Sequence, residues 1–322
     1  MKLCIVIVSF NTREQTLACL DSVFENAAFE NGQHGMQVVV VDNGSTDGSA
    51  DAIRRRHPSV LVDEAGENLG FARGVNRGVA QATADYVLLL NPDTVVLPGS
   101  LDRLMQFAEE HPQFGVFGGR TLRPDGTTDP SSCWGAPTIW SLTCFALGLS
   151  TAFKRSRIFD PESLGRWDRD TQRVVPIITG CLLLITREDW RRVGGMDESF
   201  FLYGEDAEFG IRTKRAGLTS VIVPGAVIVH EVGGSSSSSG VKMSLVMAGK
   251  ATLLRRIWSP QKARLGITLL TCGAGLRACL ELVTRRPGAW RTVWSRRADW
   301  RMGYPAATQA LRAAAGAHAG AH

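Results

Sequence analysis

The stretch from Tyr86 to Thr94 constrains the fold more than any other, because five residues with no polar face run directly into a carboxylate. Tyr86 to Leu90 has the pattern of a central parallel strand that is covered on both sides. Asn91-Pro92 ends this strand, since proline cannot donate to the ladder and restricts the residue before it. Asp93 is therefore expected at the carboxyl end of a strand, where open α/β sheets bind their ligands. It either holds a hard cation against a phosphate-bearing ligand or caps the following turn or helix.

Two earlier apolar runs also end in polar loops, and each loop leads into a stretch with helical character. Leu3 to Val8 predicts a strand, and Arg13 to Asn26 then places Leu17, Leu20 and Phe24 on one helical face. Val38 to Val41 predicts a second strand before the polar loop from Asp42 to Asp47. This alternation predicts an α/β fold with a doubly wound, mostly parallel sheet. Further short strands are expected at Ser59 to Val62, Gly115 to Gly119, Thr179 to Ile185, Val221 to Val223 and Val227 to Val229.

The loops lack the glycine-rich signatures of common nucleotide-binding folds. No G-x-G-x-x-G follows the first strand, and no G-x-x-x-x-G-K-[ST] occurs in the chain. A bound nucleotide would therefore depend on side chains and carbonyl groups. Asp42 is a candidate acceptor for a base or ribose, and its alternative role is to form an Asx turn.

Residues 67–78 predict a turn that enters a helix with several glycines. Each glycine inside a helix costs roughly 1 kcal/mol, so close approach of another backbone or of a ligand would explain them. Arg73, Asn76 and Arg77 could face that ligand, although exposed arginines are more often solvated.

A second pair of carboxylates, Glu205 and Asp206, follows an aromatic-rich loop and begins a predicted helix that runs to Ala216. The helix dipole would keep a carboxylate ionised there, as a general base toward a sugar hydroxyl requires. The alternative is that these residues only cap the helix. His230 ends the last predicted strand, and is either structural or a ligand for an ion such as Mn²⁺.

The chain of 322 residues has the apolar content of a globular protein, at 44% hydrophobic and 21% charged. No run of about 18 apolar residues lacks a charge, so no transmembrane helix is predicted. The apolar start has no small-residue cleavage site and is interpreted as a strand rather than a signal peptide. The seven cysteines form no CxxC pair, and most have apolar neighbours, which favours reduced thiols in a cytoplasmic protein.

The end of the chain differs strongly in charge from the rest. Residues 1–240 have a net charge of −7, whereas residues 241–322 carry 14 Lys/Arg and two acids, a net charge of +12. Leucines recur at helical spacing from Leu265 to Leu280, and Trp290 and Trp294 lie close to several arginines. This pattern favours a basic amphipathic helical extension that binds an anionic membrane surface. The alternative is a helical subdomain packed on the catalytic core, or a dimer interface of a homo-oligomer. A Ser-rich stretch, Ser235 to Ser239, predicts a flexible loop before it.

Seven segments in order make the chain resemble glycosyltransferase family 2, the inverting GT-A-fold enzymes, and particularly their bacterial rhamnosyltransferase-like branch. The segments span roughly residues 3–234 and are Val6 to Asn11, Val40 to Asp47, Asn68 to Ala72, Asn91 to Asp93, Gly194 to Glu198, Gly204 to Phe209, and His230. The resemblance implies a catalytic domain over residues 1–240, with a nucleotide-sugar half to about 120 and an acceptor half over 121–240. Residues 241–322 would form the C-terminal helical extension.

The resemblance also implies a role for individual residues. Asp93 would match the second acid of the family's DxD motif and bind Mg²⁺ or Mn²⁺ together with His230. Asn91 replaces the first acid of that motif, which leaves its ribose or metal role open. Asp206 would be the catalytic base, with Glu205 the substitute. The implied nucleotide-sugar-binding residues are Ser9, Asn11, Asp42, Asn68, Gly70, Arg73, Asn76 and Asn91.

We therefore expect a metal-dependent inverting glycosyltransferase of cell-surface polysaccharide synthesis. It would move a sugar from dTDP-rhamnose or a UDP-sugar to a glycan or polyprenyl-linked glycan, at the inner face of the cytoplasmic membrane. A nucleotidyltransferase would need a Gly-rich, basic loop after the first strand, and residues 9–12 provide none. A catalytically silent membrane scaffold has no need for Asp93, Asp206 and His230. The basic end lacks any nucleic-acid-binding motif, so nucleic acid is not an expected partner.

Overall fold

The computed structural model describes residues 2–26, 35–230, 239–285 and 288–309. The predicted Ser-rich loop lies outside these ranges apart from Ser239. Contacts between residues divide the chain into two compact units. The first unit comprises Met1–Trp134, Trp167–Met196 and Phe209–Ser235, and the second comprises Gly135–Arg166, Asp197–Glu208 and Ser236–His322. All seven cysteines are free thiols.

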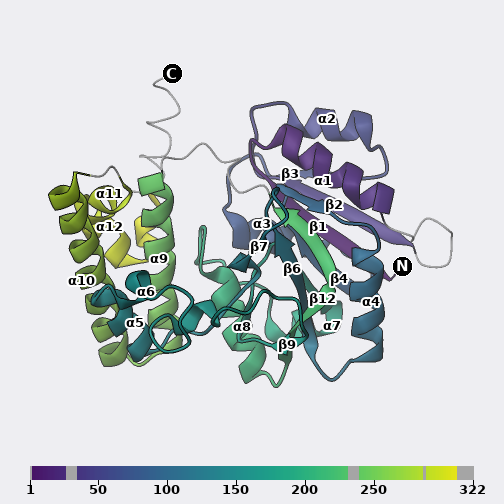
Figure 1. Ribbon diagram of the computed structural model, residues 1–322. Coiled ribbons are helices and arrows are strands. Elements are labelled where there is room, and N and C mark those ends of the chain that lie inside the picture. The colour runs from purple at the N-terminus through teal and green to yellow at the C-terminus, as the bar shows by residue number, and fades with distance from the viewer. Residues whose placement is uncertain (1, 27–34, 231–238, 286–287, 310–322) are drawn as a thin grey trace. The chain divides into compact units, whose positions relative to one another are not determined.

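The first unit is built on a central sheet of ten strands (Figure 1). Its continuous path runs in the order β3-β2-β1-β4-β11-β6-β12-β5, while β7 pairs with β6 and β9 pairs with β12. The strands are β1 (Leu3–Ser9), β2 (Met36–Asp42), β3 (Leu61–Glu64), β4 (Tyr86–Leu90), β5 (Thr94–Val96), β6 (Gly115–Leu122), β7 (Thr128–Asp129), β9 (Arg173–Val174), β11 (Leu182–Thr186) and β12 (Thr219–His230). A separate antiparallel pair is formed by β8 (Cys133–Trp134) and β10 (Ile177–Ile178).

The first four strands of the path are parallel, as the sequence predicted. Ser9 pairs with Asp42 on β2, and Ile7 pairs with Leu90 on β4, so the carboxyl ends of these strands lie at one edge. Beyond β4, β11 runs antiparallel to its two neighbours, whereas β6 and β12 are parallel to each other. The predicted loops after β1, β2 and β4 therefore meet at one edge of the sheet.

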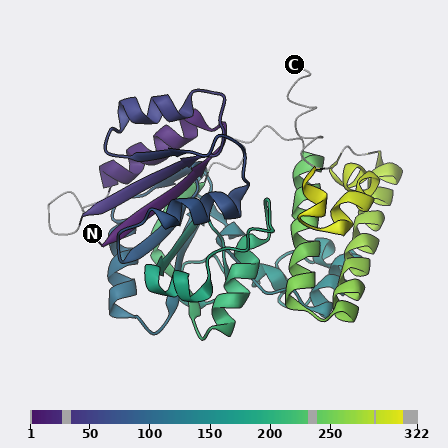
Figure 2. The same cartoon turned by 180° about the vertical axis from the view of Figure 1, so that it is seen from behind.

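Helices cover both faces of this sheet. Side chains of α1 (Arg13–Asn26), α2 (Ser49–Arg56) and α4 (Ser100–Glu110) share one buried core with alternate residues of the strands. On the other face α3 (Phe71–Ala80) packs against β1 and β2, as Figure 2 shows from behind, and α7 (Arg187–Val193) follows β11. The fold is thus three-layered, because a sheet with two apolar faces must be covered on both.

The glycines of α3 explain how closely this helix packs on the sheet. A Cβ atom at Gly74 would lie 2.8 Å from a methyl group of Val8, and one at Gly78 would overlap with Val6. At Gly74 and Gly78 the close approach is therefore made to side chains of β1, rather than to another backbone or a ligand.

The second unit is helical apart from its loops. Its elements are α5 (Ile139–Ala146), α6 (Leu149–Ala152), the 3₁₀ turn η3 (Pro161–Ser163), α9 (Ser239–Ile257), α10 (Pro260–Thr284), α11 (Trp290–Ser295) and α12 (Arg297–Met302). Helices α9 and α10 run side by side (Figures 1 and 2). Helix α8 (Glu205–Arg215) starts with residues of this unit, and its remainder belongs to the first unit. The single boundary predicted near residue 240 differs from this division, because residues 135–166 and 197–208 also pack with the C-terminal helices.

Helix α10 has an unusual distribution of side chains. Its buried face consists mainly of small residues and also contains Arg277, which donates hydrogen bonds to the carbonyl oxygen of Phe145 and the hydroxyl of Thr151. Its exposed face carries large apolar side chains, including Leu280 and Val283, which are 52% and 80% exposed. By length and composition alone, it is the one helix of the described chain that could cross a membrane.

Two local predictions were wrong. The strands expected at 221–223 and 227–229 form one continuous strand, β12, whose register shifts between Val223 and Val227. Trp290 and Trp294 lie on α11, a separate helix from α10, because α10 ends at Thr284. The aromatic pair and the leucines therefore do not form a single amphipathic helix.

Candidate active site

The loops after β1 and β2 are joined by hydrogen bonds. The backbone N–H of Asn11 donates to the hydroxyl of Ser45, and the N–H of Thr46 donates to Oδ1 of Asn11 at 2.8 Å. Asn11 has a positive φ of 51°, which turns the chain sharply after the strand. Ser9, by contrast, is fully buried, and its hydroxyl contacts those of Thr12 and Thr16. Ser9 therefore supports this loop from within.

Asp42 presents an incompletely bonded carboxylate at the end of β2. Its Oδ2 accepts a hydrogen bond from the N–H of Ser45 at 3.1 Å. Its Oδ1 is buried and finds no hydrogen-bond partner among the described residues. Buried polar atoms are nearly always bonded, so an unsatisfied acceptor fits a ligand that supplies an N–H or O–H group.

Asn68 and Gly70 lie in the turn that precedes the N-terminus of α3. Oδ1 of Asn68 accepts hydrogen bonds from the N–H of Gly70 and from the side-chain amide of Asn43. Gly70 has a positive φ of 84° and is the N-cap of α3, so the next backbone groups are oriented by this turn. Arg73, on the first turn of α3, is exposed.

Asn76 serves a different purpose from the predicted one. Its Nδ2 donates to the carbonyl oxygen of Met196, and its Oδ1 accepts from the N–H of the same residue, both at 2.9 Å. This pair of bonds fastens the Gly194-Gly195-Met196 turn to α3. The side chain thus has a structural role that periodicity alone did not indicate.

Asp93 and His230 meet at the end of β12. His230 pairs with Thr94 across the antiparallel strands β5 and β12, which places Asp93, the residue before β5, beside the imidazole. Nε2 of His230 lies 3.2 Å from Oδ1 of Asp93, and the two side chains are 12% and 23% exposed. The predicted pair is therefore in direct contact. Nδ2 of Asn91 points instead to Sγ of Cys181, at 3.2 Å.

A divalent cation fits this pair only together with ligands from a substrate. In the part of the chain that the structure describes, no group of three or more His, Cys, Asp or Glu side chains could hold a metal ion by itself. Asp93, just before β5, and His230, at the end of β12, offer one oxygen and one nitrogen. Mg²⁺ and Mn²⁺ commonly complete their coordination with phosphate oxygens and water. The donor set therefore suits a cation that binds with a diphosphate.

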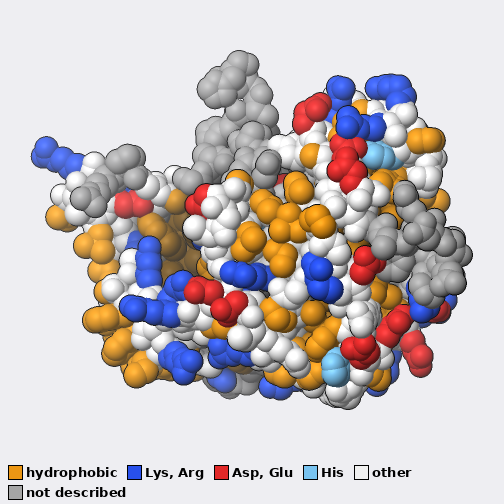
Figure 3. All heavy atoms as spheres, turned by 45° about the vertical axis from the view of Figure 1, so that its right-hand side comes forward, with side chains coloured by type: hydrophobic (Ala, Val, Ile, Leu, Met, Phe, Trp, Pro, Cys, Tyr) orange, Lys and Arg blue, Asp and Glu red, His pale blue; other side chains and the backbone are white. Residues whose placement is uncertain are grey.

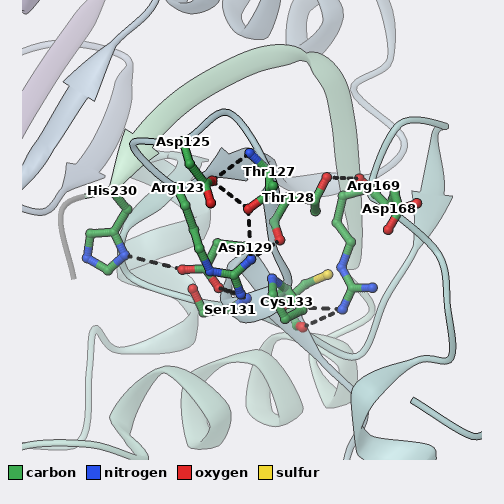
Figure 4. A network of polar contacts seen from close by, with 11 residues as sticks. Arg123, Asp125, Thr127, Thr128, Asp129, Ser131, Cys133, Asp168, Arg169 and His230 are labelled. Carbon is green, nitrogen blue, oxygen red and sulfur yellow. Dashed lines mark hydrogen bonds and ion pairs between the residues drawn. The ribbon is translucent and has the colours of Figure 1, made fainter. Parts of the chain in front are cut away.

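A third residue, Asp129, lies on the other side of the imidazole, and Figure 4 shows the polar network around it. Its Oδ2 is 3.9 Å from Nδ1 of His230, which is longer than a hydrogen bond, so the contact is electrostatic. Asp129 was missed because a Thr-Asp-Pro segment in a loop-rich stretch signals only a turn. The register of β6 with β7 and β12, which joins these segments, cannot be read from the sequence.

The contacts around the imidazole shift the pKa values of His230 and Asp129. Burial disfavours the charged form of His230, but Asp129 and Asp93 outweigh it and raise the pKa of His230 to about 9. Burial also opposes ionisation of Asp129, yet His230 and the N–H of Ser131 lower the pKa of Asp129 to about 2. Asp129 is therefore an anion throughout the physiological range.

Glu205 and Asp206 begin α8, and their environments differ. Glu205 is 5% exposed, and its Oε2 has no hydrogen-bond partner among the described residues. Burial, followed by the nearby charge of Asp206, raises the pKa of Glu205 well above its ordinary value. Asp206 is less buried, and its Oδ1 accepts a hydrogen bond from the N–H of Ala207 at 2.7 Å. Within this pair, Glu205 is thus the residue whose charged form is disfavoured.

The loop before α8 is fixed by the C-terminal helices of the same unit. The hydroxyl of Tyr304 donates to the carbonyl oxygen of Leu202 at 2.9 Å. Nε of Arg256 lies 2.9 Å from Oδ2 of Asp197. Gly249 of α9 contacts the turn at Tyr203, where the left-handed φ of 68° directs the chain into α8. The first turn of α8 is therefore positioned by residues far along the chain.

The sequence and the fold resemble those of known glycosyltransferases. The sequence profile described as Glycosyl transferase family 2 matches residues 4–166, and that of the N-terminal domain of galactosyltransferase matches residues 170–232. N-acetylglucosaminyl-diphospho-decaprenol L-rhamnosyltransferase of Mycobacterium tuberculosis is 33% identical over 213 residues. That match covers 61% of this chain and 66% of the relative, just under two thirds of its length. The O-antigen biosynthesis protein RfbC of Myxococcus xanthus is 26% identical over 240 residues, which cover 73% of this chain and 18% of that protein.

Two solved structures share the fold. The mannosyltransferase PcManGT from Pyrobaculum calidifontis, in complex with GDP-Man and Mn²⁺, has a TM-score of 0.55 and 19% identity. The superposition covers 98% of this chain and 86% of that structure. GalNAc-T7 with UDP, GalNAc and Mn²⁺ has a TM-score of 0.59 and 14% identity, over 95% of this chain and 58% of that structure. At these identities the likeness establishes the fold, which is the GT-A type.

Proposed function

The chain belongs to glycosyl transferase family 2, and from that premise we propose that it moves a sugar from a nucleoside-diphosphate sugar to a hydroxyl group of a lipid-linked glycan. The observation that carries the proposal is the contact between Asp93 and His230. A carboxylate and an imidazole placed together where β4 and β12 end suit a cation bound to a diphosphate. Asp42, at the end of β2, offers its unsatisfied oxygen to the nucleoside.

The proposed donor is dTDP-rhamnose, with UDP-sugars as the alternative. The support is the mycobacterial relative, whose name describes an L-rhamnosyltransferase. Asp42 and the loop at Asn11 would hold the nucleoside, because both lie where parallel strands end. Asn68, Gly70, Arg73 and Asn91 remain proposed contacts of the donor.

The proposed cofactor is Mg²⁺ or Mn²⁺, held by Asp93 and His230 with the diphosphate. When bound, such a cation neutralises the negative charge that develops on the departing nucleoside diphosphate. The support from other proteins is that two solved structures of the same fold contain Mn²⁺ with a nucleotide or nucleotide sugar.

Asp206 is the proposed general base. It would accept the proton of the acceptor hydroxyl while that oxygen attacks the anomeric carbon from the face opposite the leaving diphosphate, so one displacement inverts the anomeric configuration. The suppressed ionisation of Glu205 supports Asp206 over its neighbour, because a neutral acid cannot accept a proton.

The proposed acceptor is a glycan on a polyprenyl diphosphate, and the proposed location is the inner face of the cytoplasmic membrane. The mycobacterial relative is named for a decaprenol-linked substrate. The exposed leucines and valine of α10 would contact lipid, since large apolar side chains on a surface mark an interaction site. The face drawn in Figure 3 carries apolar, basic and acidic side chains together, so the proposed membrane contact rests on α10 rather than on this face.

A binding screen tests the donor part of this proposal. The full chain is heated with Mn²⁺ and each of several nucleotide sugars, including dTDP-rhamnose and UDP-N-acetylglucosamine. A ligand that binds only the native protein must raise the melting temperature. We expect one donor to do so only with the metal present, and no stabilisation by any nucleotide sugar would contradict the proposal.

A further inference from the structure

We propose that Asp129 is a positioning residue that orients the imidazole of His230 for binding a divalent cation. The inference rests on the proposed function, because it presumes the cation at Asp93 and His230. Asp129 does not touch the proposed ligand position: it faces Nδ1 of His230, whereas Asp93 faces Nε2. The imidazole thus has one carboxylate near each nitrogen, and Figure 4 shows the contact with Asp129.

The strand register brings Asp129 to this place. β7 pairs antiparallel with the end of β6, where Asp129 is opposite Thr121. β6 in turn runs parallel to β12, where Leu122 is opposite Val229, the residue before His230. Asp93 approaches from β5, on the opposite side of β12. Asp129 and His230 thus lie on β7 and β12, and Asp93 immediately precedes β5, so backbone hydrogen bonds between the strands hold the three residues near one another.

Asp129 is itself held in place and charged. It is 6% exposed, its Oδ1 accepts a hydrogen bond from the N–H of Ser131 at 3.0 Å, and a guanidinium nitrogen of Arg123 lies 3.8 Å from the same oxygen. Arg123 also donates to the carbonyl oxygen of Thr128 at 2.7 Å, which fixes the hairpin around Asp129. With Oδ1 occupied in this way, Oδ2 is directed at the imidazole.

The chemistry of a metal-bound imidazole explains why this carboxylate matters. A neutral imidazole has one N–H donor and one lone pair, and the group that faces one nitrogen decides which of them carries the proton. An anion at Nδ1 favours the proton there and leaves the lone pair of Nε2 on the side of Asp93. Carboxylates beside metal-binding histidines act in this way, and their loss typically weakens metal affinity 10- to 100-fold.

The small number of carboxylates in contact with His230 is a further reason to assign this role to Asp129. Asn91 is uncharged, and its amide points to Cys181, so Asp93 is the one carboxylate in contact with Nε2 of His230 among the described residues. Asp129 supplies a second negative charge from a different segment, and this charge faces Nδ1 of the imidazole rather than Nε2. It would strengthen the hold on a cation through His230 without occupying a coordination position.

The test measures Mn²⁺ affinity in the presence of UDP, and separately dTDP, by the electron paramagnetic resonance signal of unbound Mn²⁺. Asp129→Asn and Asp129→Ser both remove the charge, while a side-chain oxygen can still accept from the N–H of Ser131. Asp125→Asn is the matched control, because Asp125 lies in the same hairpin and bonds to Thr127 rather than to His230. Both Asp129 variants should weaken Mn²⁺ binding by roughly 10- to 100-fold, with the control within about twofold.

A double-mutant cycle separates positioning from general structural damage. In a His230→Ala background, Asp129→Asn should cost less than about twofold, because its effect passes through the imidazole. Equal losses in both backgrounds, or unchanged affinity in Asp129→Ser, would overturn the inference. Failure of Asp93→Ala to weaken binding would instead contradict the metal site of the proposed function, so the two failures are distinguishable.

Discussion

The backbone of α9 at Gly249 lies so close to the carbonyl oxygen of Tyr203 that a Cβ atom at position 249 would overlap with that oxygen. On the loop side, a Cβ atom at Gly204 would in turn lie 3.1 Å from the backbone of Gly249. Only a residue without a side chain allows this contact, and the turn that it fixes leads directly into Glu205 and Asp206. The C-terminal helices thus help to place the proposed catalytic base.

Gly249→Ala should therefore displace this turn. Inserting a methyl group into a closely packed contact costs about 1–3 kcal/mol, so the free energy of unfolding should fall by that amount. We also expect kcat to fall more than the KM of the donor rises, because the change lies at the base rather than at the donor. Lys242→Ala, on the same helix, should change the unfolding free energy by less than about 0.5 kcal/mol. Wild-type kcat in Gly249→Ala would show that the turn does not position Asp206.

Asp206→Asn should lower turnover by roughly 10²–10⁴-fold with little change in the KM of the donor, since an amide cannot accept the proton. Glu205→Gln should retain most of the activity, because a buried neutral acid is replaced by a neutral amide. Steady-state kinetics of both variants with one donor provide the comparison. Near wild-type turnover in Asp206→Asn would remove the assignment and make Glu205 the next candidate.

The raised pKa of Glu205 predicts a pH-dependent stability. Above pH 4.5, the ordinary pKa of a glutamate, the unfolded chain loses this proton while the folded protein keeps it. The folded state then binds more protons, so its stability falls as the pH rises, by about 1.4 kcal/mol for each pH unit until the folded group also ionises. Urea unfolding at a series of pH values should show this decline in wild type and a smaller one in Glu205→Gln. Parallel curves for the two proteins would contradict the buried neutral acid.

Replacing exposed apolar residues of α10 tests membrane contact without removing a helix. In Leu280→Ser/Val283→Ser, both changed side chains are exposed, so the melting temperature should be unaffected while co-sedimentation with phosphatidylglycerol vesicles falls about tenfold or more. Leu61→Ser, at an exposed leucine of β3, is the control and should sediment like wild type. Equal sedimentation of the double variant and wild type would leave this face of α10 without a role at a membrane.

Much of the sheet could be predicted because its strands have no polar face. The run from Tyr86 to Leu90 forms β4 as expected, and the loops after β1, β2 and β4 meet at one edge because parallel strands share their direction. These strands and loops depend on local patterns that one stretch of sequence contains. The pairing of Asp93 with His230 was predicted from the family resemblance.

Other features depend on pairings between distant segments. The place of Asp129 comes from the register of β7 on β6, and the role of Asn76 comes from the backbone of Met196, neither of which has a local signal. The charge of residues 241–322 indicated binding to a membrane surface. The sequence did not show that the leucines of α10 are exposed, because this depends on the small residues and Arg277 forming its buried face. The types of side chain on a helix therefore show which of its faces is buried only when the segment that packs against the helix is also known.

Sugar transfer itself is the most direct test of the account. Wild type and Asp93→Asn are incubated with Mn²⁺, N-acetylglucosaminyl-diphosphoprenol and, in turn, dTDP-rhamnose and UDP-hexoses, and the lipid is analysed by mass spectrometry. We predict that one donor adds a single sugar to the lipid in the wild-type reaction, and that the product is strongly reduced with Asp93→Asn. An acceptor lipid that gains no sugar from any donor, or equal transfer by Asp93→Asn, would contradict it.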